Sequence, residues 1–444
     1  MGKNNKARRA AKAKRRAKRG TPRSRGEATQ GPRGFDGLGP DPGPDPRFQA
    51  PALWLALNTA VDEGAPTQRH AEALASLPAR MADPEAETIL ARQIDAIWGA
   101  GWQPAELRRL VRRRRTKRLA GLLEVAVHAD HARRPGQALD ERWAAQLREL
   151  GSRDVSLQGS WLANWRAAEG LDRATSYLHA AQLIVELGRL PVLDVLIPPP
   201  GRPSGAVRGV PTSSSTTGDP MLARVRKLLD KAESTEFEEE ATAFTAKAQE
   251  LMSRHAIDQA AVSAQDAEDT PRMVRLPVDA PYADAKSVLL AEIALANRCR
   301  AVYLKGLEMS TVVGHAEDLG LVELLFTSLL VQAQHALAEA GRGQDLGARA
   351  RSQSFRSSFF LAYASRIGER LQLVTADVLA EAGETSSSAL VLRDREHAVE
   401  ESMDAWFGDL LEASHVRGGY DGVGLAYGRR AADQAALDAG ELAG

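Results

Sequence analysis

Residues 221–258 read MLARVRKLLDKAESTEFEEEATAFTAKAQELMSRHAID, and this stretch predicts two helices joined by a short turn. The first helix has one apolar stripe, formed by Leu222, Val225, Leu228, Leu229 and Ala232. Thr235 followed by Glu238 has the spacing of a capping box that starts the second helix. The second helix carries a further apolar set, Ala241, Phe244, Ala248, Leu251 and Met252. Because the turn is short, we expect the helices to be antiparallel neighbours.

Three features of this stretch resemble the bacterial family called domain of unknown function 2786. They are RKLLDKAEST at residues 226–235, the glutamate run that opens the second helix, and AKAQELMSRHAI at residues 246–257. The following region, with FRSSFFLAYASRIGERL at residues 355–371, resembles the companion domain that often follows in that family. The family has no settled activity, so the resemblance implies an architecture and no catalytic residues.

Working outward from the hairpin, composition divides the chain into five segments. Residues 1–50 are basic and then rich in Gly and Pro, with few large apolar side chains. Burial of apolar surface therefore cannot offset the conformational entropy lost on ordering, and this segment is expected to be disordered. Three- and four-residue spacing of Trp, Leu and Ala predicts a helical domain. The expected segments are a tail (1–50), a helical domain (51–197), a linker (198–218), the hairpin domain (219–265) and a C-terminal domain (280–444).

The C-terminal segment predicts helices together with a few strands. Residues 282–297 are expected to be helical, and residues 298–314 to form two strands around Lys305–Gly306. Further expectations are helices at 315–340 and 351–382, a strand at 386–394 and a Gly-rich loop at 417–428 before a last helix. The predicted fold class is therefore mainly α, with a helical N-terminal domain, a helical hairpin and an α+β C-terminal domain.

Charge is divided unevenly along the chain, although the total is formally neutral. Residues 1–25 hold twelve Lys and Arg and no acidic residue, whereas residues 219–444 hold 23 basic and 36 acidic residues. This asymmetry indicates a tail that binds an external polyanion such as nucleic acid, or one that rests on the acidic half of its own chain. The two interpretations are compatible, since contact with the acidic half would tune binding.

The helix predicted by LRRLVRRRRTKRL, residues 107–119, carries dense positive charge within the folded part. Leu107 and Leu110 start an apolar stripe, which is interrupted where Arg114, Arg115 and Arg118 follow. Crowded like charges cost helix stability, and phosphate groups would offset that cost. The alternative is a solvated helix end with local acidic partners. The candidate nucleic-acid-binding residues are Lys12, Lys14, Arg15, Arg16, Lys18, Arg19, Arg112, Arg113, Arg114, Arg115, Lys117 and Arg118.

Other motifs carry less chemistry. His397, Glu400 and Glu401 resemble an inverted zincin motif in which the second His is replaced by Glu, and His128 with His131 gives too few ligands for zinc. We therefore expect no metal site and no cofactor, and the catalytic residues stay unknown. Six tryptophans between residues 54 and 165 could stack on bases, but core packing is the favoured interpretation.

The expected function is association with nucleic acid without sequence specificity, through the tail and the arginine helix. One alternative is a hydrolase acting on nucleic acid, with its site in the C-terminal domain. Another is an RNA- or protein-assembly factor whose acidic half binds a basic partner. A single cysteine, Cys299, and the absence of an apolar segment after the basic N-terminus favour the cytoplasm. The longest apolar runs are too short for a membrane span. DNA or RNA preference and oligomeric state stay open.

Overall fold

A computed structural model describes residues 46–151, 155–202, 209, 220–234, 238–263, 270–342, 346, 348–383, 386–411 and 420–435 of the chain. Residues Ala50–Gly444 form one compact unit, and Met1–Gln49 are a unit of their own. The candidate tail residues between Lys12 and Arg19, and the predicted cap Thr235, lie outside the described residues.

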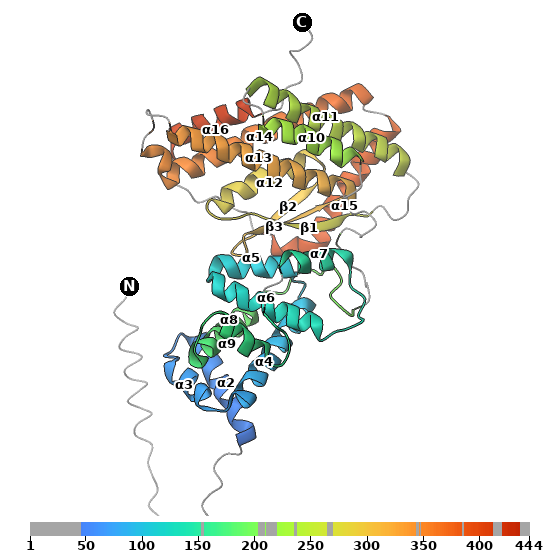
Figure 1. Cartoon of the computed structure of the whole chain (residues 1–444). Coiled ribbons are helices and arrows are strands. Elements are labelled where there is room, and N and C mark those ends of the chain that lie inside the picture. Colours follow the sequence, from blue (N-terminus) through green and yellow to red (C-terminus); the bar gives the residue numbers. More distant parts are fainter. Residues whose placement is uncertain are drawn as a thin grey trace, which may run out of the picture. The chain divides into compact units, whose positions relative to one another are not determined.

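Helices alone make up the N-terminal part of the described chain (Figure 1). They are α2 (Pro46–Glu63), α3 (Gln68–Ser76), α4 (Ala79–Gly99), α5 (Pro104–Arg114), α6 (Lys117–Ala132), α7 (Glu141–Glu149), α8 (Trp161–Ala168) and α9 (Arg173–Gly188). The helical character predicted for residues 51–197 is confirmed. All six tryptophans between residues 54 and 165 are buried among these helices, so their predicted core role is also confirmed.

The C-terminal part combines helices with one small sheet. Its helices are α10 (Pro220–Ser234), α11 (Glu238–Ser263), α12 (Ala283–Ala296), α13 (Ala316–Arg342), α14 (Gln353–Ala382), α15 (Ser387–Phe407) and α16 (Gly422–Gln434), with short 3-10 turns at Arg349–Arg351 and Gly408–Leu410. The strands are β1 (Arg272–Pro277), β2 (Arg300–Leu304) and β3 (Met309–Gly314). The predicted fold class, mainly α with an α+β C-terminal region, is confirmed.

The sheet is antiparallel, in the order β1-β3-β2. Its central strand, β3, is buried along its whole length, which suits a strand that is paired on both edges. In Figure 1 the sheet lies between α5 and α7 on one side and α12 on the other. Leu307 and Met309, from the β2–β3 turn and the start of β3, pack in the N-terminal helical core. The sheet therefore contributes to both cores.

Buried polar side chains join the α10–α11 hairpin to the helices that follow. The Nε2 of Gln249, a fully buried residue of α11, donates to the side-chain oxygens of Asn297 and Thr375, both at 3.2 Å. Buried polar groups need partners of this kind. Such bonds fix the orientation of the hairpin more specifically than apolar contact alone.

Three segments of the C-terminal part differ from the sequence-based expectation. Residues 387–394 begin helix α15 and are not a strand: Ser386 caps the helix, and the buried residues Ala389, Leu392, Arg395 and Val399 recur every three or four positions. The sequence does not predict strand β1, since Arg272 and Arg275 interrupt its apolar alternation. The Gly-rich segment is helical from Gly422 onward, and Gly418 and Gly419 lie outside the described residues.

Helix α13 is the one described helix that is long and apolar enough to cross a membrane by length and composition alone. In the structure its side chains Leu325, Leu329 and Ala333 are buried in the C-terminal core. A core helix with a broad buried face has a similar composition.

Candidate anion-binding cleft on helix α5

The start of α5 follows the sequence-based prediction. Pro104 occupies the first helical position, and the Glu106 carboxylate accepts the backbone N–H of Gln103 at 3.1 Å. Trp102 and Leu107 are both fully buried in the N-terminal core, as expected for a hydrophobic staple. These contacts fix the helix at its first turn, and so they fix the directions in which its arginines project.

The same glutamate anchors α5 to the sheet. Arg275 of β1 donates from Nε to Glu106 Oε1 at 2.7 Å, and its side chain is only 3% exposed. The other nitrogens of Arg275 donate to the carbonyl oxygens of Asp194 and Gly101 at 2.8 and 2.6 Å. Removing this guanidinium would leave several partly buried acceptors without a donor, so it stabilises the junction between α5 and the sheet.

Two arginines of α5 bind the loops at the end of the sheet. Arg109 Nε donates to Asp279 Oδ1 at 2.7 Å, and Arg109 also donates to the carbonyl oxygen of Glu308. Arg113 pairs with the Glu308 carboxylate at 2.6 Å and donates to the carbonyl oxygen of Ala280, also at 2.6 Å. These hydrogen bonds join residues that are 167 to 199 positions apart in sequence, so no local pattern indicated them.

The end of α5 and the start of α6 are paired with acidic residues of the helical part. Arg114 and Arg115 both bind Glu186 of α9, at 3.3 and 2.6 Å. That carboxylate is only 6% exposed. Arg118 binds Glu169 at 3.1 Å. Local acidic partners, the alternative considered from the sequence, therefore exist for these three arginines.

Arg112 and Lys117 differ from the other basic residues of this segment. Both are exposed, and neither has a hydrogen-bonded or ion-paired partner among the described residues. Every residue from Arg112 to Arg118 is exposed, as the interruption of the apolar stripe predicted. The single helix predicted over residues 107–119 is wrong, because α5 ends at Arg114 and the Thr116 side chain caps a new helix, α6. Whether any of these side chains binds nucleic acid stays a prediction.

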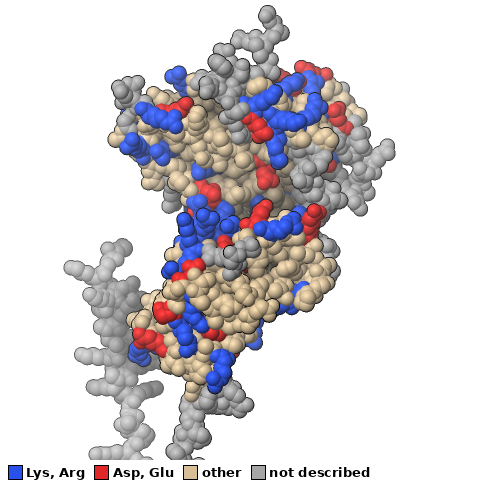
Figure 2. Space-filling view, viewed as in Figure 1, with Lys and Arg blue, Asp and Glu red and all other residues tan. Residues whose placement is uncertain are grey.

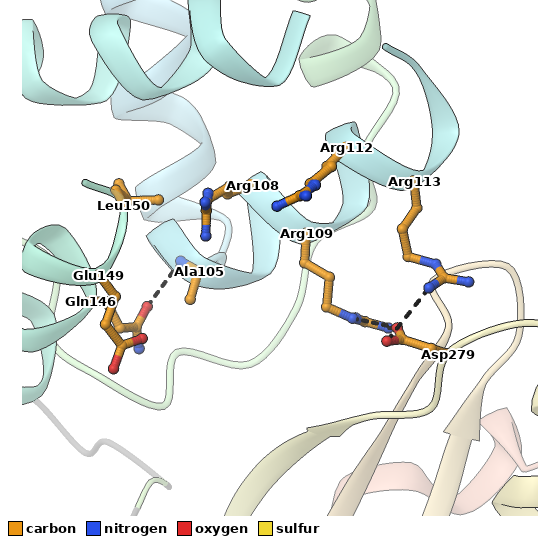
Figure 3. A pocket seen from close by; sticks show the side chains of 9 residues that line it. All are labelled: Ala105, Arg108, Arg109, Arg112, Arg113, Gln146, Glu149, Leu150 and Asp279. Atoms are coloured by element: carbon orange, nitrogen blue, oxygen red, sulfur yellow. Dashed lines mark hydrogen bonds and ion pairs between the residues drawn. The ribbon is translucent and has the colours of Figure 1, made fainter. Parts of the chain in front are cut away.

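A cleft of about 490 Å³ opens beside α5. It is lined by Ala105, Arg108, Arg109, Arg112, Arg113, Gln146, Glu149, Leu150 and Asp279. Figure 3 shows Arg109 and Arg113 pointing to Asp279, while Arg108 and Arg112 lie beside each other farther from that carboxylate. Two of these arginines, Arg112 and Arg113, were candidates from the sequence. The sequence carries no local signal for the α7 wall or for Asp279, which only the fold brings to α5.

The electrostatics of the cleft follow from this arrangement. Figure 2 shows Lys and Arg atoms gathered at the level of α5, with Asp and Glu atoms among them. Behind Asp279 lies Lys286, a buried residue whose Nζ donates to the Asp279 carbonyl oxygen at 3.0 Å. Burial is the main cause that lowers the pKa of the Lys286 ammonium; the charge of Asp279 opposes this shift, and the charge of Arg113 adds to it. The region thus concentrates cations, of which Arg112 alone lines the cleft without a described partner.

The histidine motifs considered from the sequence do not converge on a shared site in the described structure. His397 is 72% exposed and lies 3.3 Å from Glu401, while Glu400 is bound by Arg300 at 2.7 Å. His128 bonds the carbonyl oxygen of Gly151, and His131 is exposed. Across the described ranges, no group of three or more His, Cys, Asp or Glu side chains is arranged to hold a metal ion.

The one cysteine, Cys299, is fully buried directly before β2. Burial raises the pKa of its thiol well above the usual range, in spite of the neighbouring arginines Arg298 and Arg300. A thiol in this protonated, enclosed state is a poor nucleophile. The structural role favoured from the sequence is therefore consistent with its surroundings.

Comparison with known families gives one match. Residues 221–259 match the model of a family described as "Protein of unknown function (DUF2786)". This confirms the resemblance of the α10–α11 hairpin, whereas the companion domain stays a prediction because the match ends before β1. No curated protein and no solved structure matches the chain. The match concerns the hairpin alone and transfers no chemistry to the cleft on α5.

Proposed function

We propose that the protein associates with nucleic acid without sequence specificity, and that its basic tail supplies most of the phosphate contacts. The observation that carries the proposal is the block of twelve Lys and Arg, with no acidic residue, in residues 1–25. Cations at this density attract the phosphate backbone of any sequence. The candidates in this block are Lys12, Lys14, Arg15, Arg16, Lys18 and Arg19.

The folded part would add a smaller contribution from α5 and α6. Arg112 and Lys117 can meet phosphates without giving up an ion pair, because neither has a described partner. Arg113, Arg114, Arg115 and Arg118 are already paired with carboxylates, so each would have to exchange one anion for another. Within the folded part, Arg112 and Lys117 are therefore the residues best placed to bind phosphates.

The test is a deletion of residues 1–25, with binding to labelled single-stranded and duplex oligonucleotides measured over a range of salt concentrations. Affinity should fall for all sequences alike. The slope of log affinity against log salt should flatten by about 0.7 to 0.9 for each phosphate that the shortened chain no longer neutralises. The melting temperature of the protein should hardly change, because the deleted residues carry too few apolar side chains to form a core.

A deletion of residues 26–45 is the matched control, since it removes a similar length of chain with one arginine and four acidic residues. This control should bind nucleic acid as well as the full chain does. An unchanged salt slope after deletion of residues 1–25 would reject the tail as the phosphate-binding element. A large fall in melting temperature would instead show that the tail packs on the folded unit.

A further inference from the structure

The cleft beside α5 holds its arginines in place before any ligand arrives. Arg108 Nε donates to Glu124 at 2.8 Å, and the side chains of Arg109 and Arg113 are fixed by Asp279 and Glu308. A guanidinium has five N–H donors, so a single carboxylate partner does not exhaust it. Arginines that are already oriented lose little side-chain entropy when a ligand binds.

Arg112 is the member of this set with no described partner, and it lies beside Arg108 (Figure 3). The two residues are four positions apart, so they project from the same side of the helix. Two neighbouring guanidiniums present the planar, forked donors that match the oxygens of a phosphate group. This pair is therefore the part of the cleft that suits a phosphate.

The opposite wall of the cleft has different chemistry. Helix α7 contributes the Glu149 carboxylate, and Leu150 follows at its end. Gln146 is occupied, because its side chain accepts the backbone N–H of Ala105 at 3.1 Å and donates to Gln103 at 2.6 Å. A carboxylate binds hydroxyl and amino donors, and Leu150 and Ala105 give apolar surface. A ligand that fits both walls carries a phosphate at one end and hydrogen-bond donors at the other.

We infer that the α5–α7 cleft is a binding site for a nucleoside monophosphate, with the phosphate on Arg108 and Arg112 and the sugar or base donors on Glu149. A cleft of about 490 Å³ falls within the range of small-molecule sites and is too small for a duplex. The nucleotide could be free or could be the phosphorylated end of a strand. This site lies in the folded unit, so it goes beyond the proposed association through the tail and does not depend on it.

The experiment is calorimetric titration of the full-length protein with adenosine 5′-monophosphate. Binding should be saturable, and adenosine without its phosphate should bind about tenfold more weakly or not at all. Arg112→Gln should lower the affinity by about tenfold, because it removes charged hydrogen bonds to the phosphate. The fold should be unaffected, since Arg112 is exposed and has no described partner.

Arg92→Gln is the matched control, because Arg92 is an exposed arginine of α4 outside the cleft and likewise has no described partner. It should bind the nucleotide as the unmodified chain does. A trinucleotide with a 5′-phosphate that binds more tightly than the mononucleotide would assign the site to strand ends, and equal or weaker binding would assign it to free nucleotides. The inference is overturned if the mononucleotide does not bind, or if Arg112→Gln and Arg92→Gln have the same affinity.

Discussion

The arginines around Asp83 and the arginines of α5 are both held by carboxylates, but they differ in how far they are removed from water. Arg166 and Asp83 pair at 2.9 Å with side chains that are 11% and 3% exposed. Arg113 and Asp279, by contrast, are 33% and 46% exposed at 3.5 Å. Water is therefore largely excluded from the Arg166–Asp83 pair, whereas the Arg113–Asp279 pair remains in contact with solvent.

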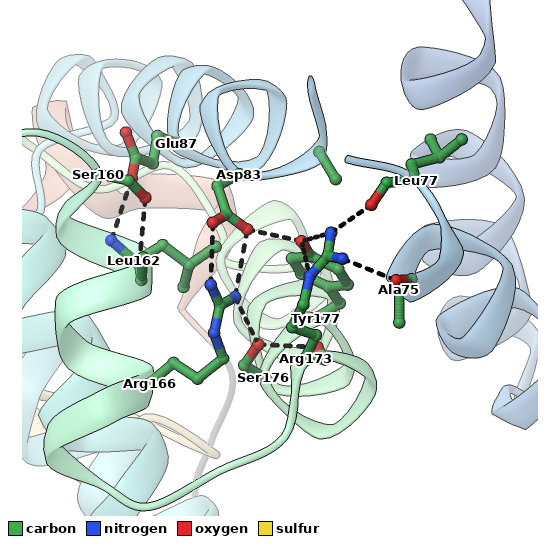
Figure 4. A network of polar contacts seen from close by, with 12 residues as sticks. Ala75, Leu77, Asp83, Glu87, Ser160, Leu162, Arg166, Arg173, Ser176 and Tyr177 are labelled. Carbon is green, nitrogen blue, oxygen red and sulfur yellow. Dashed lines mark hydrogen bonds and ion pairs between the residues drawn. The ribbon is translucent and has the colours of Figure 1, made fainter. Parts of the chain in front are cut away.

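The network around Asp83 is also more fully bonded (Figure 4). Arg166 binds both carboxylate oxygens of Asp83, and the Tyr177 hydroxyl donates to the same carboxylate at 2.6 Å. Arg173 donates to Tyr177 and to the carbonyl oxygens of Ala75 and Leu77. This network joins α3, α4, α8 and α9, and the side chains of Asp83 and Arg166 are almost fully removed from solvent.

The comparison indicates which arginines are structural and which are available for binding. A buried, fully bonded guanidinium stabilises the fold, because removing it would leave its partner carboxylate charged and unpaired in a medium of low dielectric constant. A guanidinium that borders a cleft and keeps free donors can bind an anion from outside. The two groups differ in sequence, since Arg112–Arg115 are consecutive whereas Arg166 and Arg173 are isolated, but neither pattern states which carboxylate each arginine meets.

The largest expected effect is that of Arg166→Met. It leaves the Asp83 carboxylate buried with the Tyr177 hydroxyl as its remaining described hydrogen-bond partner, and breaking such a pair costs about 3 to 5 kcal/mol. Denaturant unfolding would measure the loss. The control is Arg189→Gln, which breaks the exposed pair with Asp62 and should cost less than about 1 kcal/mol. Equal losses in the two variants would contradict the distinction between the two regions.

A second variant tests the buried contact between α5 and the sheet. Arg275→Gln removes the guanidinium that binds Glu106 and two carbonyl oxygens, and the expected loss is about 2 to 3 kcal/mol. The loss of unfolding free energy caused by Arg275→Gln should persist at high salt, because the Arg275 side chain is only 3% exposed and salt screens buried pairs little. A loss that disappears in salt would mean that this junction is as hydrated as the Arg113 pair.

The pair between Arg113 and Glu308 should contribute less to stability. Arg113→Gln is expected to cost about 1 kcal/mol or less, since both side chains are roughly one-third exposed. Salt should reduce even this loss by screening. The measurement is denaturant unfolding at low and high ionic strength, in parallel with the Arg275 variant. A cost that is larger than for Arg275→Gln would reverse the assignment of roles along α5.

The smallest effect concerns Glu87, which caps α8 beside the buried network. Its carboxylate accepts from Ser160 and the Leu162 N–H, but burial raises its pKa above the usual value. A raised folded-state pKa favours the folded state below about pH 4.5, and this contribution is lost as pH rises through the folded-state pKa. Glu87→Gln keeps an acceptor and removes the charge.

Glu87→Gln should therefore match the unmodified chain near pH 4 and exceed it at pH 7, by less than about 1 kcal/mol after allowance for solvent screening. Unfolding measured at both pH values would show the difference. A variant that is less stable at pH 7 would mean that the charged cap outweighs the cost of burying the carboxylate.

Some features of the candidate site followed from the sequence alone. The apolar stripe that begins at Leu107 and stops before Arg114 predicted that the end of α5 would be exposed, which it is. Pro104 and Glu106 predicted where the helix begins. Each of these signals lies within about one or two helical turns, so the chain needs no distant contact to produce it.

The close packing of α16 on α14 shows what local signals leave out. The sequence pattern places Gly424 and Gly428 in a loop, yet both are buried in a helix. A Cβ at Gly424 would overlap the carbonyl oxygen of Phe355, and one at Gly428 would overlap that of Phe359. These glycines allow the backbones of α14 and α16 to come into close contact. The sequence around a glycine does not indicate which distant helix will pack against it.

The sequence by itself therefore determined the helical character of residues 51–197, the places of the hairpin helices and of α12, α13 and α14, and the turn between β2 and β3. It also determined the burial of the tryptophans and the exposure of residues 112–115. Only the tertiary structure decided that α15 is helical, that β1 joins the sheet, and that Asp279, Glu308 and Glu186 meet those arginines. The reason is that hydrophobic periodicity encodes which side of an element is buried, within a few residues. The partner of a charged side chain depends on proximity in space between segments that can lie 170 residues apart.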